Sequence, residues 1–315
     1  MAGEMWDLRI VFASANIADP RYLRLFRVLP VAVGHFATGA GFGGVEWHPV
    51  MDWAASPRAI AQAVASHDLA VHSLHAAFRT TARSRDVNVP GGEVPQGVAA
   101  KAAASPLGRI LMPEVVASTQ FMTAVQERIG PRPRVLYPQR DPALDREATS
   151  APGGPRLVQV TDHVAALLGA RTPEEIIEKL SARGYDGIIL DTHHLHPLRY
   201  GKGLPPVASK LSRSLPIFAP YIYGAHIALD RQDTAVGNPD LQAYTHRALE
   251  EALKGRFTGV TGEIMTAAWE APRFAYAALE TTAQQVASTT GYTSRIDLQE
   301  AYREIGNHLK AYGSA

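Results

Sequence analysis

Short apolar runs alternate with longer segments of helical periodicity along most of the chain. Eight runs have the length and composition of buried strands, at residues 8–13, 44–47, 69–74, 134–137, 157–160, 187–191, 224–228 and 259–264. The run at 187–191 is the clearest, because its apolar residues are continuous. Continuous apolar runs are typical of strands that are covered on both faces, as in parallel sheets.

Segments with a helical pattern fit between these strands. The pattern predicts helices near residues 57–66, 114–129, 172–184, 240–254, 272–288 and 296–312. Alternating strands and helices indicate parallel strands joined by right-handed crossovers. We therefore expect an α/β fold, a (β/α)8 TIM barrel that spans residues 1–315 as a single domain, with an extra C-terminal helix at 296–312.

Two segments fit this repeating pattern badly. Residues 79–112 form a long polar stretch after the third predicted strand, and residues 138–155 hold four prolines and two glycines where a fourth helix should lie. The second stretch predicts an irregular fourth βα unit. Long loops of this kind are functional lids or weakly ordered segments.

Composition narrows the classes of function. The chain has 315 residues, of which 46% are hydrophobic, and a formal net charge of +1. This balance argues against nucleic acid as a partner, because it provides no strong field for steering a polyanion. Without cysteine, a metal site must use His, Asp, Glu or amide oxygen. The absence of a signal sequence and of a long apolar segment predicts a cytoplasmic protein without membrane contact. Composition leaves open whether the protein is a homo-oligomer.

Polar residues recur where the predicted strands end. The positions are Glu46, His75, Gln159, Asp191, His226 and Glu263. In a parallel barrel these ends meet at one mouth, where active sites are built. Most of these residue types bind divalent metals, so the pattern predicts a shared site there. The alternative is a mouth lined by hydrogen-bonded residues without a metal.

Several short motifs occur in the order in which a known superfamily has them. They are His75-Ala76-Ala77-Phe78, Asp191-Thr192-His193-His194, His226-Ile227-Ala228-Leu229-Asp230 and Gly262-Glu263-Ile264. Together they resemble the xylose isomerase-like TIM barrels, which include the sugar phosphate isomerases and epimerases and the endonuclease IV-type AP endonucleases of family 2. The resemblance covers roughly residues 7 to 290.

The resemblance implies a metal-dependent enzyme that acts on a polyol, a sugar or a related hydroxy-carbonyl compound. It implies one divalent ion (Mn, Co, Zn or Mg), held by Asp191, His226 and Glu263 with Gln159 as a fourth ligand. Glu263 or His75 would then be the base and His194 an acid, in an isomerase, epimerase or lyase reaction. Glu46, Trp47 and Lys202 are expected to contact this small-molecule substrate.

The chain also departs from the superfamily pattern. Gln159 stands where the epimerases have a glutamate, and an amide cannot accept a proton at neutral pH. Tyr137-Pro138-Gln139 replaces the fourth-strand histidine of endonuclease IV, and Gln232 replaces another histidine. We therefore expect no complete three-zinc cluster. Two alternatives stay open: a non-catalytic, binding-only barrel and an endonuclease IV-like phosphodiesterase with a reduced metal site.

Overall fold

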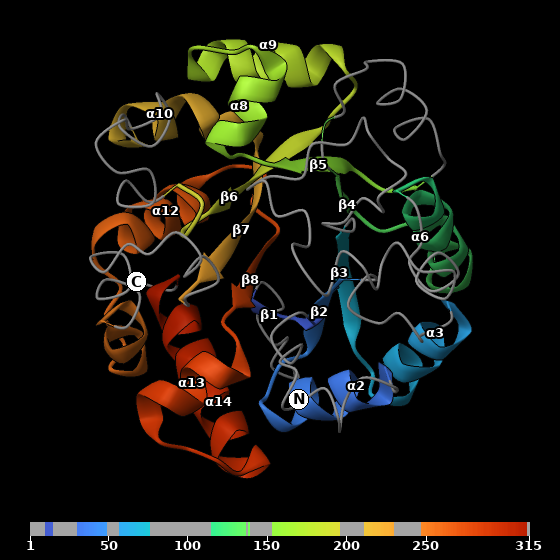
Figure 1. Ribbon diagram of the computed structural model, residues 1–315, viewed down its shortest axis with the longest axis vertical. Helices are drawn as coiled ribbons and strands as arrows, with labels where there is room; N and C mark the ends of the chain where they lie inside the picture. Colours follow the sequence, from blue (N-terminus) through green and yellow to red (C-terminus); the bar gives the residue numbers. More distant parts are fainter. Residues whose placement is uncertain are drawn as a thin grey trace, which may run out of the picture.

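The structure is a computed structural model of the chain. It describes residues 10–14, 30–48, 57–75, 115–136, 138, 153–195, 211–229 and 247–313. Eight parallel strands follow one another around a closed barrel, which confirms the TIM-barrel prediction (Figure 1). They are β1 (Ile10–Ala13), β2 (Gly44–Trp47), β3 (Ala70–His75), β4 (Arg134–Leu136), β5 (Arg156–Gln159), β6 (Gly187–Asp191), β7 (Ile222–Ala228) and β8 (Tyr276–Glu280).

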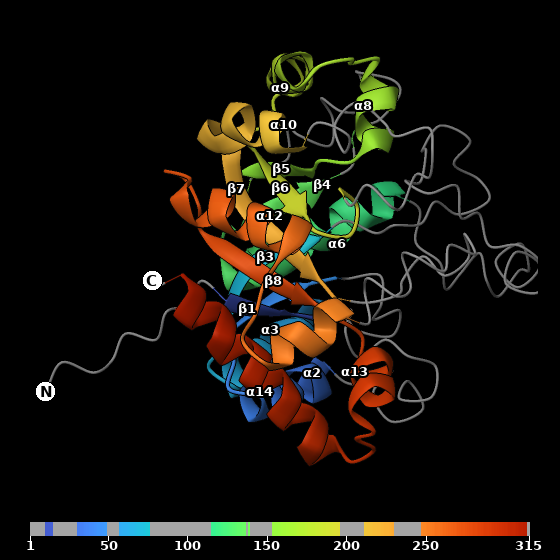
Figure 2. The ribbon, with the colours of Figure 1, turned by 90° about the vertical axis from the view of Figure 1, so that its left-hand side faces the viewer.

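Helices surround the barrel, as the two ribbon views show (Figures 1 and 2). Those described in full are α2 (Pro30–Gly39), α3 (Pro57–Ser66), α6 (Val115–Ile129), α8 (Asp162–Leu168), α9 (Pro173–Ala182), α10 (Leu211–Phe218), α12 (Gly259–Glu270), α13 (Ala283–Thr290) and α14 (Arg295–Tyr312). The short 3-10 helix η5 (Ala219–Tyr221) follows α10. None of the helices in the described ranges is long and apolar enough to cross a bilayer.

Helix capping explains where several of these helices begin. The Thr172 side chain accepts a hydrogen bond from the backbone N–H of Glu175 at the start of α9, with Pro173 in the first turn. Ser294 caps α14 in the same way through the N–H of Asp297. The additional C-terminal helix predicted at 296–312 is therefore confirmed as α14.

Side chains alternate between the interior of the barrel and the layer beneath the helices. The interior cluster consists of Val11, Ala13, Val135, Leu157, Ile189, Tyr276 and Ala278, and a larger cluster joins the outer faces of the strands to the helices. Gln159, Asp191 and Glu280 each follow an interior residue by two positions. Because strands have a period of two, all three side chains point into the barrel at its C-terminal end.

The eighth strand differs from the prediction. Residues 259–264 begin helix α12, preceded by Thr258 in an extended conformation, and β8 is Tyr276–Glu280. This strand closes the barrel by pairing with β7 on one side and β1 on the other. The helix predicted at 272–288 is consequently wrong over residues 272–282, and α13 begins only at Ala283.

A glycine in β7 allows the strands to approach closely. A Cβ atom on Gly224 would lie 2.9 Å from the carbonyl oxygen of Tyr276 and 2.9 Å from Cδ1 of Ile189. A larger side chain would therefore push β7 away from β6 and β8, which carry part of the polar cluster at the mouth.

The two irregular segments stay predictions. Residues 79–112, and residues 139–152 of the fourth βα unit, lie outside the described part of the chain.

Candidate active site

Strand register brings polar side chains together at the C-terminal mouth of the barrel. Asp191 pairs with His226 across β6 and β7, and Ala228 pairs with Glu280 across β7 and β8. The buried polar set around them comprises Glu46, His48, His75, Gln159, Asp191 and His226, with Glu280 only 12% exposed through its side chain. Asp191 and His226, two of the three residues expected to share a metal site with Glu263, thus lie side by side at the mouth.

His226 lies at the centre of this cluster and is fully buried. Its Nδ1 atom is 3.4 Å from Glu280 Oε1 and 3.7 Å from Asp191 Oδ2, and its Nε2 atom is 3.0 Å from Glu46 Oε1. Neither ring nitrogen makes a hydrogen bond in the described part of the structure. Burial alone would lower the pKa of His226, but the carboxylates of Glu280 and Glu46 raise this pKa well above its usual value.

Asp191 is held by hydrogen bonds on both oxygens. Oδ1 accepts the backbone N–H groups of His193 and His194, each at 2.7 Å, and Oδ2 accepts the Nε2 amide of Gln159 at 2.6 Å. Burial raises the pKa of Asp191, but the charge of His194 and the contact with His226 outweigh burial and hold this pKa below its usual range. Asp191 is therefore a fixed anion with little freedom to turn.

Three groups of potential metal ligands occur among the described residues. They are Glu46 with His75 and His226, Glu46 with His48 and Glu280, and Asp191 with His226 and Glu280, with ligand atoms in each group within 4.8 Å of one another. The third group fits a divalent ion best, because the buried Nδ1 of His226 lacks a hydrogen bond and faces two carboxylates. Gln159 lies beside this group.

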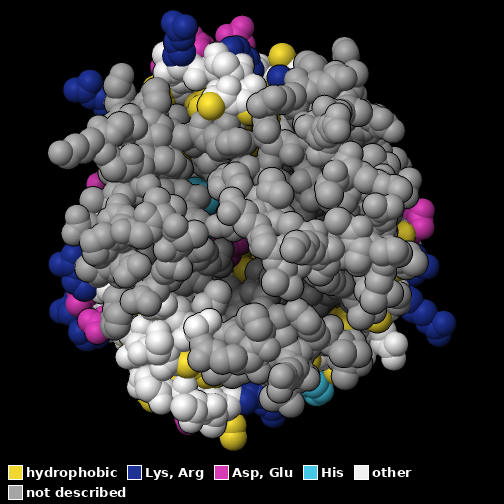
Figure 3. All heavy atoms as spheres, in the orientation of Figure 1, with side chains coloured by type: hydrophobic (Ala, Val, Ile, Leu, Met, Phe, Trp, Pro, Cys, Tyr) yellow, Lys and Arg dark blue, Asp and Glu magenta, His cyan; other side chains and the backbone are white. Residues whose placement is uncertain are grey.

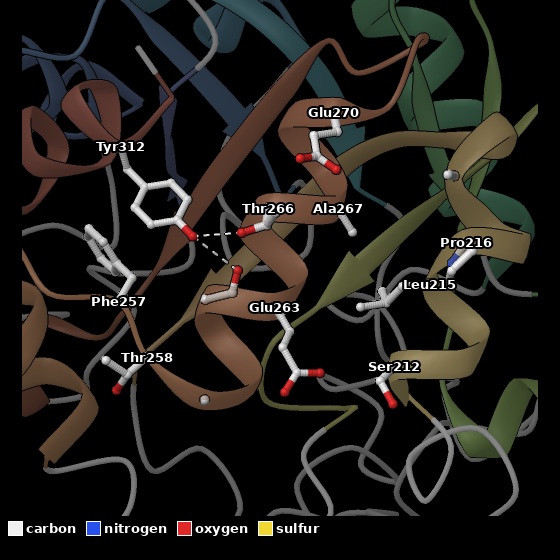
Figure 4. Close-up of a pocket in the computed structure, with 13 residues that line it drawn as sticks. Ser212, Leu215, Pro216, Phe257, Thr258, Glu263, Thr266, Ala267, Glu270 and Tyr312 are labelled. Atoms are coloured by element: carbon white, nitrogen blue, oxygen red, sulfur yellow. Dashed lines mark hydrogen bonds between the residues drawn. The ribbon is translucent and has the colours of Figure 1, made fainter. Parts of the chain in front are cut away.

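Glu263 does not belong to this cluster. It lies exposed on helix α12 and lines a groove of about 660 Å³ between α10 and α12, with Ser212 and Leu215 opposite (Figure 4). The expectation that Glu263 ends the eighth strand is wrong, and Glu280 occupies that place. Accordingly, Glu263 is neither the metal ligand nor the base that the sequence pattern indicated.

The other expected residues are placed as follows. His75 is fully buried at the end of β3, and its ring stacks on that of His48 with centroids 4.5 Å apart. His194 is half-buried beside Asp191. Trp47 points away from Glu46 on β2 and packs, fully buried, in the cluster beneath the helices, which gives no support to a substrate contact. Lys202 lies outside the described residues.

Sequence reasoning missed Glu280 as a member of the site. The apolar run Tyr276-Ala277-Ala278-Leu279 directly precedes it, and Thr281 and Thr282 follow. An apolar run of this length that ends in a carboxylate is the same signal that identified Asp191. The alanines of this run favour helix, so the run was not recognised as a strand.

Figure 3 shows the surface of the molecule in the orientation of Figure 1. Among the described side chains seen in Figure 3, a histidine and an acidic group lie near the middle of the face, and Lys and Arg side chains lie around its edge.

Comparison with solved structures shows the fold. No family model and no curated protein matches the sequence. An L-ribulose 3-epimerase is similar at 16% identity with a TM-score of 0.50, and the match covers 96% of this chain and 95% of that one. A D-psicose 3-epimerase from Clostridium cellulolyticum H10, solved with D-tagatose, is similar at 12% identity with a TM-score of 0.51, over 96% and 98% of the two chains. The chain has the fold of the sugar 3-epimerases.

A family 2 AP endonuclease from Brucella melitensis is also similar, at 14% identity and a TM-score of 0.47, over 91% of this chain and 99% of that one. The two 3-epimerase structures confirm the TIM-barrel fold that the resemblance implied.

Proposed function

We propose that this protein is a metal-dependent enzyme that moves a proton on a sugar or a related hydroxy-carbonyl compound. The observation that carries the proposal is the geometry of His226, whose buried Nδ1 atom faces the carboxylates of Asp191 and Glu280. These three residues would hold one divalent ion. When bound, the ion would supply electrostatic stabilisation of the negative charge that develops on a substrate oxygen.

Glu280 is the group we assign as the base. Its side chain is 12% exposed, whereas the side chains of Asp191 and Glu46 are exposed by 1% and 0%. Of these three carboxylates, Glu280 is therefore best placed to touch a substrate and to accept its proton. His194, half-buried beside Asp191, is the candidate acid.

Gln159 restricts the type of proton transfer. Epimerisation moves a proton from one face of a planar intermediate to the other, so it needs an acid–base group on each face. The Gln159 amide cannot accept a proton, and its Nε2 donates to Asp191. The cluster therefore favours proton transfer on a single face of the intermediate, as in an aldose–ketose isomerisation or an elimination by a lyase.

A binding-only barrel is the second candidate, and one observation favours it. Both oxygens of Asp191 already accept hydrogen bonds from the chain, including the Gln159 amide. A polar cluster satisfied in this way would persist without a metal or a reaction.

Metal analysis separates these candidates. Protein first stripped of metal with a chelator, which is then removed, should bind one equivalent of Mn²⁺, Co²⁺ or Zn²⁺ in calorimetric titration. Glu280→Gln should weaken metal binding by at least about 100-fold, because changing a residue that only contacts a metal ligand already lowers metal affinity by ~10- to 100-fold. Glu263→Gln is the matched control, since it removes the same charge from an exposed helix position.

Solvent exchange then tests the reaction. Incubation with a panel of aldoses and ketoses in D2O, followed by NMR, should show deuterium beside the carbonyl group with the wild type and with Glu263→Gln, and none with Glu280→Gln. A wild type that binds no metal would favour the binding-only barrel. Loss of binding in Glu263→Gln with Glu280→Gln intact would contradict the assigned ligands.

A further inference from the structure

Glu46 is the most enclosed carboxylate of the cluster. It lies on β2 with no exposed surface, and its Oε2 atom accepts hydrogen bonds from the Ser73 hydroxyl at 2.6 Å and the Tyr276 hydroxyl at 2.7 Å. Its Oε1 atom makes a 3.1 Å hydrogen bond with Nε2 of His48. These neighbours fix the direction of the carboxylate, and the substrate contact expected of Glu46 stays a prediction.

The carboxylate approaches His226 from the side opposite to the proposed metal ligands. Glu46 Oε1 lies 3.0 Å from Nε2, whereas Asp191 and Glu280 lie near Nδ1 on the other edge of the ring. A neutral imidazole carries its proton on one nitrogen and a lone pair on the other. When an ion binds Nδ1 and the ring is neutral, the Glu46 carboxylate 3.0 Å from Nε2 would hold the remaining proton there, which leaves the lone pair on Nδ1 for the ion.

We propose that Glu46 is a positioning residue that fixes the orientation and the tautomer of His226, so that Nδ1 is presented to the metal ion. The inference rests on the proposed function. It adds a role for β2, a strand that supplies none of the three proposed ligands. Carboxylates behind metal-binding histidines act in this way in many proteins, and removing them lowers metal affinity.

A second metal site is the competing explanation for the same residues. Glu46, His48 and Glu280 also have ligand atoms within 4.8 Å of one another. However, three side-chain hydrogen bonds already occupy the two oxygens of Glu46, and a fourth group, His226, lies at 3.0 Å. The positioning role requires no change in these contacts, whereas an ion bound to Glu46 would have to displace at least one of them.

The test is a calorimetric titration of Glu46→Gln and the wild type with Mn²⁺. Glutamine keeps the shape of Glu46 but presents a weaker, uncharged acceptor to Nε2. We expect one equivalent in both proteins and an affinity lower by about 10- to 100-fold in Glu46→Gln. Glu263→Gln should bind as tightly as the wild type.

Each other result has a distinct meaning. Two equivalents in the wild type and one in Glu46→Gln would overturn the positioning role in favour of a second ion. One equivalent with equal affinity in the two proteins would show that Glu46 is merely structural. No binding by the wild type would overturn the proposed function itself, and the inference with it.

A second measurement does not depend on affinity. Long-range ¹H–¹⁵N NMR of the wild type loaded with diamagnetic Zn²⁺ should show the His226 ring protonated at Nε2. A ring protonated at Nδ1 instead would overturn the proposal, whatever the titration gives.

Discussion

Tyr276→Phe removes one hydroxyl from the interior of the barrel. The hydroxyl donates to Glu46 Oε2 at 2.7 Å, and the whole side chain is buried. Burial and the charge of Glu46 raise the pKa of Tyr276 well above its usual value, so the phenol stays protonated and acts as the donor. The variant leaves the ring in place, where it packs at 6.4 Å from the ring of Tyr223.

The expected loss of stability follows from the charge of the acceptor. Hydrogen bonds to charged groups contribute ~1.5–3 kcal/mol, about twice the value for neutral pairs. Ser73 and His48 still donate to Glu46 in the variant, so these hydrogen bonds still offset part of the cost of burying the carboxylate. We therefore expect Tyr276→Phe to lower the free energy of unfolding by about 2 kcal/mol.

Urea denaturation followed by circular dichroism measures this change. Tyr292→Phe is the control, because Tyr292 is 41% exposed, and surface changes usually stay within about 0.5 kcal/mol. A loss below about 0.5 kcal/mol in Tyr276→Phe would refute the reasoning, since it would mean that Glu46 is not a buried anion that depends on this donor.

Two further predictions concern charge at and below the mouth. Gln159→Glu should tighten Mn²⁺ binding measured by calorimetry and destabilise the metal-free protein. The reason is that a second carboxylate replaces the amide that lies 2.6 Å from Asp191. Weaker binding in a folded variant would place residue 159 outside the metal site. Burial, together with the charge of Arg132, lowers the pKa of His72 to about 4. The unfolded chain therefore binds more protons between pH 4 and about 6.5, and folding should lose up to about 3 kcal/mol as the pH falls through this window. His72→Gln should flatten that loss in urea titrations across the window, and an unchanged slope would assign the acid sensitivity to other groups.

The sequence predicted most of the barrel because its signals are local. The buried strand at 187–191 and the helix at 57–66 have the predicted bounds, since a continuous apolar run and an amphipathic period each depend on neighbouring residues alone. The prediction of the eighth strand was wrong because it, too, used only local signals. Its alanines favour helix locally, and only pairing with β7 and β1 makes residues 276–280 a strand.

The candidate site was predictable in part. Asp191 and His226 could be found because they mark strand ends, and Glu280 was missed along with its strand. The partners of Glu46 depend on a shift of register between β2 and β3, which moves the pairing from Val45 with Val71 to Glu46 with Ser73. Such a bulge is set by long-range packing, so no local pattern could have indicated that Ser73 and Tyr276 hold this carboxylate.

Asp191, His226 and Glu280 are the residues we propose to hold one divalent ion. The most direct measurement is an anomalous difference map from crystals of the wild-type protein soaked with Mn²⁺. We expect one strong peak at about 2 Å from a carboxylate oxygen of Asp191, from Nδ1 of His226 and from a carboxylate oxygen of Glu280. A map without a peak at the barrel mouth, or with its only peak beside Glu263, would contradict the proposal.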